Sequence, residues 1–233
     1  MIRSETGSFG KPILAPAVLA LAVSLLFSAP LVSCTGSSHF HHSFADAELW
    51  SKRFDAPDRR DWQKPEEVVE LMHITPGMTV ADIGAGTGYF LGYLSPLVGA
   101  HGKVLGLDVE PNMVAFMTDR ATREGWSNVE VRTVQPGDPG LSDRTVDRIL
   151  IVNTWHHIED RKRYGRKLYD ALTPGGEVFV VDFTHQSPHG PPVSQRLQPE
   201  EVMAELQGGG FEAQVLQESL PYQYIVAGRH LAE

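Results

Sequence analysis

The sequence predicts an α/β protein with a doubly wound, mostly parallel seven-stranded sheet that ends in an antiparallel edge hairpin. From Pro65 onward, helical and strand-like apolar patterns alternate, which is typical of repeated βα units around a parallel sheet. Glycine and proline turn residues separate these patterns. The last two strand-like segments flank Pro221 and are expected to form the edge hairpin.

The apolar pattern and the turn residues place each element in order. Pro65 suits the first position of a helix, and Pro111 and Gly125 mark the start and end of a longer one. The expected elements are a helix over 66–73, a strand over 79–83, a helix over 89–98, a strand over 103–107 that closes on Asp108, a helix over 111–124, strands over 129–134 and 146–152, a helix over 161–172, a tight turn over 173–176, a strand over 178–181, a helix over 200–207, and hairpin strands over 211–216 and 222–226.

Composition excludes several classes of protein. The chain has 233 residues, of which 42% are hydrophobic and 21% charged, so it suits one sizeable core and neither a collagen-like nor a disordered chain. A net charge of −9 offers no general basic surface, so nucleic acid is not an expected partner. The single cysteine, Cys34, excludes an intrachain disulfide and a metal site built from several cysteines.

The N-terminal segment is similar to an export signal. Arg3 and Lys11 precede a charge-free run over 13–32, whose apolar centre over 18–27 is too short to span a bilayer unaided. The run ends in Leu31-Val32-Ser33-Cys34, which resembles the lipobox of bacterial lipoproteins. This resemblance implies that residues 1–33 form a cleaved signal peptide and that Cys34 is lipidated. An uncleaved leader with an incidental cysteine is the alternative, since Glu5 dilutes the positive charge.

Residues 34–64 are expected to form a tether and an arm before the domain at 65–233. The tether carries His39, His41 and His42, a pattern that could hold a transition metal, but no carboxylate or cysteine is fixed nearby and a solvated linker is the simpler interpretation. No metal site is therefore predicted. The arm carries Trp50, Phe54 and Trp62 and is too aromatic for a free linker, so we expect it to pack on the domain.

A glycine loop between the first strand and the next helix is the most informative motif. Gly84, Gly86 and Gly88 permit a left-handed backbone and let it approach a ligand, and the helix start offers unpaired N–H groups. A nucleotide-like ligand is implied. The dinucleotide fingerprint G-x-G-x-x-G requires glycine where this chain has Tyr89, which argues against NAD and FAD.

The pattern Asp82-x-Gly-x-Gly-x-Gly resembles motif I of class I S-adenosylmethionine-dependent methyltransferases. Segments 106–113, 146–158 and 172–178 are similar to later motifs of the family, and the resemblance covers about 65–229. It implies the class I methyltransferase fold and S-adenosylmethionine as cofactor. The residues that it implies for cofactor binding are Asp82, Gly84, Ala85, Gly86, Thr87, Gly88, Asp108, Val109, Met113, Asp138 and Asn153.

Two of these residues have distinct roles in the resemblance. Asp108 takes the place of the acidic residue that accepts both ribose hydroxyl hydrogens, a task that suits a carboxylate. Asp138 follows the third strand, where the family places contacts to adenine. On the residues alone, Asp82 also suits a cap of the loop, and Asp108 an N-cap of the next helix.

A sulfonium methyl group is already activated, so the protein chiefly holds the acceptor in line with the C–S bond and excludes water. Positioning can contribute ~7–11 kcal/mol, more than the ~10²–10⁴-fold of a general base, which is therefore optional. His156 and His157 are the candidates for such a base because they follow the fourth strand at the ligand-binding edge, with a slight preference for His157. The alternative is that they orient their loop, while Tyr89 and Trp62 shape the pocket.

The sequence thus predicts a methyltransferase that acts on a small-molecule or lipid-soluble acceptor. The alternatives are a membrane-anchored S-adenosylmethionine or S-adenosylhomocysteine binding protein without turnover, and an NAD-dependent oxidoreductase on a similar sheet. Thr35 after the cysteine resembles the sorting pattern of outer-membrane lipoproteins, so a membrane-associated protein on the periplasmic side or at the outer membrane is expected. A cytoplasmic location is the alternative, since the cofactor is made there. The oligomeric state stays open.

Overall fold

A computed structural model describes Gly10 and residues 46–231, and residues 46–231 lie in one compact unit. The predictions for Cys34, His39, His41 and His42 fall outside the described residues. The elements, in chain order, are α1 (Ala47–Phe54), α2 (Arg59–Gln63), α3 (Pro65–Leu71), β1 (Thr79–Ile83), α4 (Leu91–Val98), β2 (Lys103–Asp108), α5 (Pro111–Glu124), β3 (Val129–Thr133), β4 (Val146–Val152), η1 (Trp155–His157), α6 (Arg161–Ala171), β5 (Leu172–Phe183), η2 (Val193–Gln195), α7 (Pro199–Gly209), β6 (Glu212–Val215) and β7 (Gln223–Arg229).

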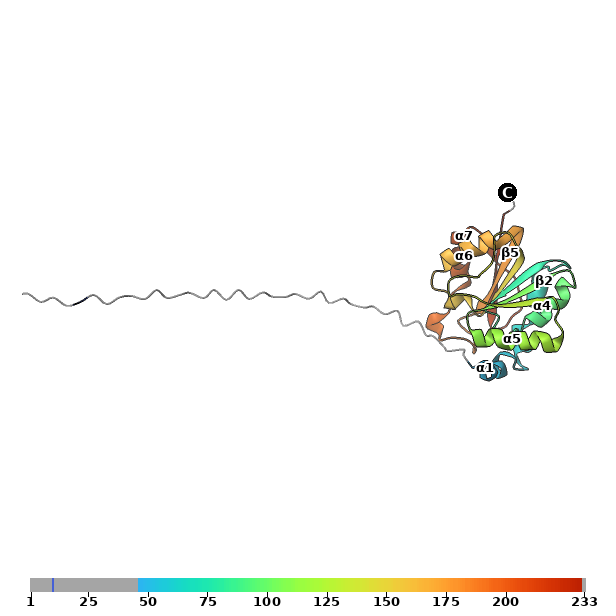
Figure 1. Ribbon diagram of the computed structural model, residues 1–233. Coiled ribbons are helices and arrows are strands. Elements are labelled where there is room, and N and C mark those ends of the chain that lie inside the picture. Colours follow the sequence, from blue (N-terminus) through green and yellow to red (C-terminus); the bar gives the residue numbers. More distant parts are fainter. Residues whose placement is uncertain (1–9, 11–45, 232–233) are drawn as a thin grey trace, which may run out of the picture. The chain divides into compact units, whose positions relative to one another are not determined.

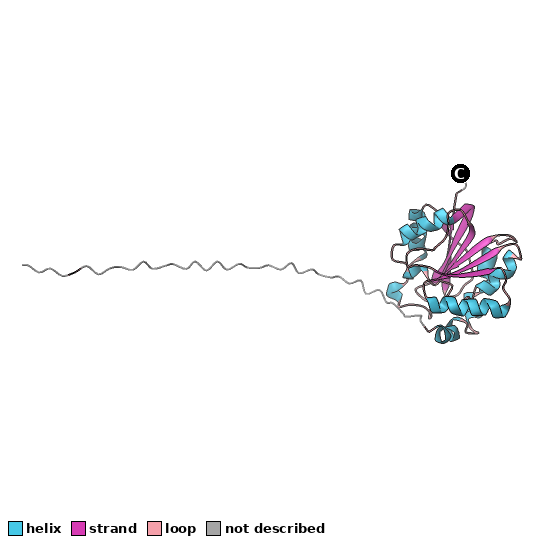
Figure 2. Cartoon of the chain, viewed as in Figure 1, coloured by secondary structure: helices cyan, strands magenta, loops and turns pink. Residues whose placement is uncertain are grey.

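The strands form one seven-stranded sheet in the order β3-β2-β1-β4-β5-β7-β6. Figure 2 shows the sheet in magenta with helices around it. Neighbours from β3 to β5 are parallel, whereas β7 is antiparallel to both β5 and β6. The predicted fold class, an α/β sheet with an antiparallel C-terminal hairpin, is confirmed. Within that hairpin β7 lies inside the sheet and β6 forms the edge.

Helices cover both faces of the sheet (Figure 1). Alternate strand residues belong to the core clusters on the two faces. On β1 and β4, Ala81 and Ile149 face the layer of α6 and α7, whereas Val80 and Leu150 face α3 and α4. All four side chains have 0% exposure. The sheet is therefore buried on both faces, and ligands can reach it only at its edges.

The structure corrects some element boundaries. The segment 173–176 is not a tight turn between two elements, because β5 already begins at Leu172 and pairs with β4 across a register shift. Gly175 supplies a positive φ of 80° within that irregular pairing. The helix expected from Tyr89 begins only at Leu91. The turn that follows the glycine loop extends through Tyr89, and Phe90 is the N-cap residue of α4.

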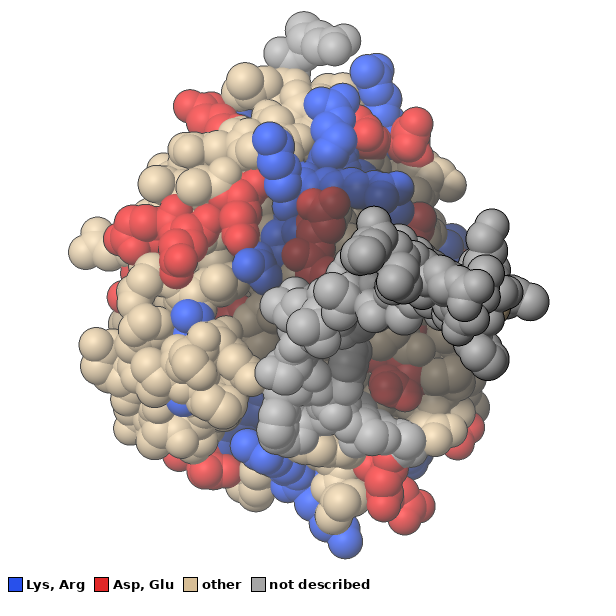
Figure 3. Space-filling view, turned by 90° about the vertical axis from the view of Figure 1, so that its left-hand side faces the viewer, with Lys and Arg blue, Asp and Glu red and all other residues tan. Residues whose placement is uncertain are grey.

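The described part of the chain offers no helix that combines the length and the apolar character needed to cross a bilayer. On the face shown in Figure 3, Lys and Arg side chains lie among Asp and Glu side chains. This face thus presents the mixed charge of an ordinary protein surface.

Candidate functional site

Four strands bring chemistry-bearing residues to one edge of the sheet. β1 ends at the glycine loop and β2 at Asp108, β4 ends directly before Asn153, and Asp182 is the penultimate residue of β5. β1 pairs with β2 on one side and with β4 on the other, so the chain reverses its direction across the sheet at β1. Such a reversal opens a crevice at the carboxyl ends of the strands, where parallel sheets bind ligands.

The glycine loop follows β1 with positive φ at Gly84 (71°), Gly86 (58°) and Gly88 (77°). The backbone N–H groups of Gly84 and Ala85 both donate to the Leu107 carbonyl, at 2.8 and 3.1 Å. A Cβ built on Gly84 would lie 2.3 Å from Thr154 Oγ1, so no other residue fits there. The loop is thus fixed between β2 and the segment after β4.

Asp108 connects this loop to the end of β2. Its Oδ2 accepts a hydrogen bond from the Gly86 N–H at 2.8 Å, and its Oδ1 accepts one from the Glu110 N–H at 3.0 Å. Burial raises the pKa of the Asp108 carboxyl, and the two backbone hydrogen bonds oppose that rise. The carboxylate is therefore both a cap of the turn before α5 and an acceptor at the crevice.

The N-terminal arm, residues 46–63, packs against the glycine loop. Asp55 Oδ1 accepts from the Thr87 hydroxyl at 3.3 Å and from Arg120 Nη1 at 2.9 Å. The Phe54 ring lies 3.5 Å from the position of a Cβ on Gly86. Figure 1 shows α1 beside α5, from which Arg120 comes. The arm contacts the crevice directly.

Asp82 lies at the base of the loop and is 2% exposed. Its burial raises the pKa of the carboxyl to about 7, with Arg59 opposing the rise and Asp108 adding to it. Arg59 comes from α2 of the arm, and burial lowers the pKa of its guanidinium to about 10, so it stays protonated at neutral pH. The guanidinium carbon lies 4.1 Å from the centre of the Tyr89 ring. A positive and a negative group thus both lie next to the glycine loop.

A chain of amides joins the arm to the end of β4. Gln63 Nε2 donates to Gln223 Oε1, and Gln223 Nε2 donates to Asn153 Oδ1 at 2.6 Å. Gln63 and Gln223 are fully buried, and Asn153 has a positive φ of 55°. The contact fixes Asn153 in a conformation that few residues adopt without support.

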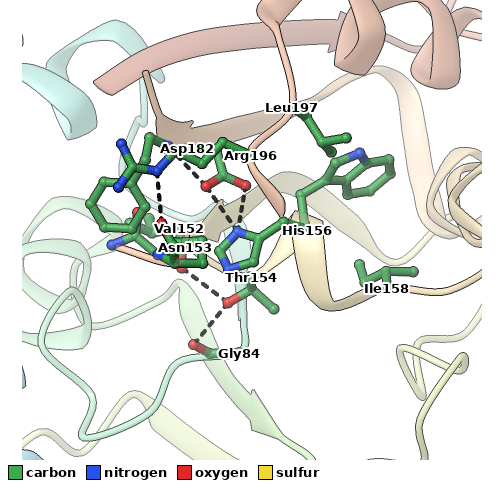
Figure 4. A network of polar contacts seen from close by, with 12 residues as sticks. Gly84, Val152, Asn153, Thr154, His156, Ile158, Asp182, Arg196 and Leu197 are labelled. Atoms are coloured by element: carbon green, nitrogen blue, oxygen red, sulfur yellow. Dashed lines mark hydrogen bonds and ion pairs between the residues drawn. The ribbon is translucent and has the colours of Figure 1, made fainter. Parts of the chain in front are cut away.

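His156 lies on η1 directly after β4. Its Nδ1 lies 2.9 Å from both carboxylate oxygens of Asp182, and both side chains are at most 5% exposed. In Figure 4 the His156 ring lies between Asp182 and Thr154, whose hydroxyl donates to the Val152 carbonyl and lies 3.5 Å from the Gly84 carbonyl. Trp155, with 0% exposure, anchors the turn in the core. A buried carboxylate thus orients the imidazole.

His157 is exposed and its ring centre lies 4.2 Å from that of His156. The slight preference for His157 as a base rested on position alone, and the structure gives the oriented geometry to His156. We therefore assign the stronger candidacy to His156.

The other predicted site residues differ in their surroundings. Val109 is 47% exposed beside Asp108, whereas Met113 is 1% exposed, inside the fold. Asp138 is exposed, and its carboxylate accepts from Lys167 Nζ at 2.8 Å, which lowers the pKa of Asp138. The roles of these three residues toward a cofactor stay predictions.

Sequence reasoning missed Asp182, Arg59 and Asp55. Asp182 was visible as a carboxylate after the strand-like run 178–181, and the end of that parallel strand must reach the same edge. Arg59 and Asp55 carry no such signal, because their contacts depend on how the arm folds back. Only the aromatic content of the arm indicated that it packs at all.

A family model described as a methyltransferase domain matches residues 80–176. Among solved structures, a SAM-dependent methyltransferase from Aquifex aeolicus superposes with a TM-score of 0.74 at 30% sequence identity, covering 80% of this chain and 99% of that one. The range of the family model, residues 80–176, includes the glycine loop, β2 and the segment with His156.

Curated relatives match about half of the chain. Phosphoethanolamine N-methyltransferase 1 of Arabidopsis thaliana is 32% identical over 126 residues, which are 54% of this chain and 25% of the relative. A ubiquinone/menaquinone biosynthesis C-methyltransferase of Hydrogenovibrio crunogenus is 29% identical over 126 residues, which are 54% of this chain and 49% of the relative. The matched region thus spans from a quarter to about half of these relatives.

Proposed function

Because the chain belongs to the S-adenosylmethionine-dependent methyltransferases, with S-adenosylmethionine as cofactor, we propose that it transfers a methyl group to a small-molecule acceptor at the crevice between β1 and β4. When bound, the cofactor supplies a methyl group that its sulfonium charge activates. The protein's task is then to hold both reactants in line and to remove a proton where the acceptor carries one.

The residues of the crevice fit this cofactor. The Asp108 oxygens accept backbone hydrogen bonds from Gly86 and Glu110, and a carboxylate has further lone pairs for the ribose hydroxyls. The left-handed backbone at Gly86 leaves space that a side chain would fill. We assign the ribose to Asp108 and the amino-acid end to the loop from Gly84 to Gly88 with Asp82. Val109, Met113, Asp138 and Asn153 stay proposed contacts that rest on the family resemblance.

The His156–Asp182 pair is the observation that carries the catalytic part of the proposal. An Nδ1–H that donates to the Asp182 carboxylate fixes the neutral tautomer with its lone pair on Nε2. Nε2 is then the proton acceptor for a hydroxyl or another acidic X–H group of the acceptor molecule. The carboxylate also stabilises the imidazolium that results.

The acceptor class rests on the relatives and on charge. The names of the two curated relatives refer to small molecules: phosphoethanolamine in one, and ubiquinone and menaquinone biosynthesis in the other. A net charge of −9 disfavours a nucleic acid acceptor. A lipid-soluble acceptor would suit the membrane anchor that the segment from Leu31 to Cys34 predicts. We propose this anchor, and a location outside the inner membrane, from the sequence alone.

Methyl transfer tests the proposal directly. The full-length protein is incubated with methyl-labelled S-adenosylmethionine and a panel of amino alcohols, phenols and quinols, and labelled product is separated. With the acceptor found, His156→Asn keeps a donor toward Asp182 but lacks the base, so kcat should fall about 10²–10⁴-fold while the Kd for S-adenosylhomocysteine stays unchanged.

His157→Asn is the matched control, one residue away on the same turn, and it should keep nearly full kcat. A His156→Asn enzyme with the kcat of wild type would show that positioning alone carries the reaction. Binding without label transfer to any acceptor would favour a binding protein without turnover.

A further inference from the structure

Arg59 is held beside the glycine loop by contacts that leave part of its guanidinium available. Its Nε donates to Gln63 Oε1 at 2.9 Å and its Nη1 to the Phe54 carbonyl. The guanidinium also lies over the Tyr89 ring in a cation–π contact. Its Nη2 donates to no residue that the structure describes, so these N–H groups are free for a ligand.

Asp82 lies at the base of the same loop, two residues before Gly84, and its carboxyl and the Arg59 guanidinium each shift the pKa of the other. Within the described chain the two groups form no direct ion pair. Asp82 is 2% exposed, and Arg59 is partly buried. Buried charges that stay apart are costly unless something between them pairs with both.

The amino-acid end of S-adenosylmethionine carries a negative carboxylate and a positive ammonium group on one carbon. We propose that Arg59 binds this carboxylate through Nη2, with the ammonium group toward Asp82. The proposal rests on the proposed function, since it extends the same cofactor site to the arm. It makes the arm a part of the binding site and not only a cover over it.

A purely structural role for Arg59 is the competing interpretation. The guanidinium joins Phe54, Gln63 and Tyr89, so its loss could loosen the arm and weaken every ligand equally. If Arg59 binds the carboxylate, its replacement should instead weaken the binding of ligands that have this carboxylate and spare ligands that lack it. The two interpretations therefore differ in ligand dependence.

The test compares S-adenosylmethionine with decarboxylated S-adenosylmethionine, which keeps the nucleoside, the sulfonium and the amine. Isothermal titration of the full-length wild type should give roughly 10- to 100-fold tighter binding of the carboxylated ligand. In Arg59→Gln this preference should fall to about threefold or less, with affinity for the decarboxylated ligand almost unchanged. Arg59→Lys should give an intermediate preference, because it keeps the charge without the planar fork.

Arg60→Gln is the matched control, since Arg60 is exposed, pairs with Glu66 and should keep the wild-type preference. Equal binding of both ligands by the wild type would overturn the proposal without any variant. Equal losses for both ligands in Arg59→Gln would overturn it in favour of the structural role. A wild type that binds neither ligand would instead contradict the proposed function.

Discussion

The two halves of the crevice are built in different ways. In the half formed by β1 and β2, the glycine loop and Asp108 are joined by a hydrogen bond between residues 22 positions apart, within one βαβ unit. In the half formed by β4, β5, β7 and the arm, Gln63 and Gln223 are 160 positions apart. The first half is a local motif, whereas the second depends on the completed fold.

This difference separates the two tasks of the proposed enzyme. The local half fits a cofactor that is common to the whole family. Its residues lie close together in the sequence, so they form a pattern that can be recognised there. The assembled half contains the candidate base, His156, and is the half in which we propose that the acceptor binds. Variants of the glycine loop and of Asp108 should therefore change cofactor binding, whereas a variant of His156 should change turnover.

The largest effect is expected where the halves touch. Gly84→Val places a branched side chain at a φ of 71° and against Thr154 Oγ1, which lies 2.3 Å from the Cβ position. Strain and overpacking together should lower the free energy of unfolding by roughly 4 kcal/mol or more and abolish S-adenosylhomocysteine binding. Thermal unfolding with and without this ligand measures both.

Gly137→Val is the control for strain alone, because Gly137 has a φ of 73° and nothing lies within 4 Å of its Cβ position. Gly86→Val is intermediate, since only the Phe54 ring lies near, at 3.5 Å. Equal destabilisation of Gly84 and Gly137 variants would show that the contact between the halves is unimportant.

The second prediction concerns Asp82, whose pKa burial raises to about 7. In the unfolded chain this carboxyl ionises near pH 4, whereas the folded protein keeps the proton until about pH 7, so its contribution to stability falls as pH rises between these values. Asp82→Asn removes this loss and should stabilise the ligand-free protein at pH 8 by up to ~4 kcal/mol. The same change should weaken S-adenosylhomocysteine binding.

Urea unfolding at pH 4.5 and pH 8 gives the stability difference. Asp138→Asn is the control of opposite sign, because Lys167 lowers the pKa of that exposed carboxyl and the pair stabilises only above the pH at which it ionises. An Asp82→Asn protein less stable than wild type at pH 8 would contradict the account of Asp82 as a costly buried charge.

The third and smallest effect is expected at Asp108. Asp108→Ala removes a charged acceptor for the ribose hydroxyls. The binding free energy of S-adenosylhomocysteine should therefore weaken by about 1.5–3 kcal/mol, measured as a higher Kd. The 2′-deoxyribose analogue of this ligand should lose less affinity in the variant than the parent does. If the variant loses the same affinity for both ligands, Asp108 acts only by holding the backbone of Gly86 and Glu110.

Sequence patterns predicted the local half of the site closely and the assembled half poorly. The bounds of β1 and α5 agree with the apolar pattern and with the Pro111 and Gly125 signals, because those signals act over a few residues. The orientation of His156 by Asp182 needed the register of β4 against β5. The helices of the arm and the position of Arg59 needed the packing of α1 and α2, which no periodicity in so short a segment predicts.

Titration of the full-length protein with S-adenosylhomocysteine tests the central claim most directly. The account predicts one binding site per chain, competition by S-adenosylmethionine, and no competition by NADH. It also predicts that Gly84→Val abolishes binding and that His156→Asn leaves it unchanged, because only the first lies in the local half. Binding of NADH in place of S-adenosylhomocysteine, or equal loss in both variants, would contradict it.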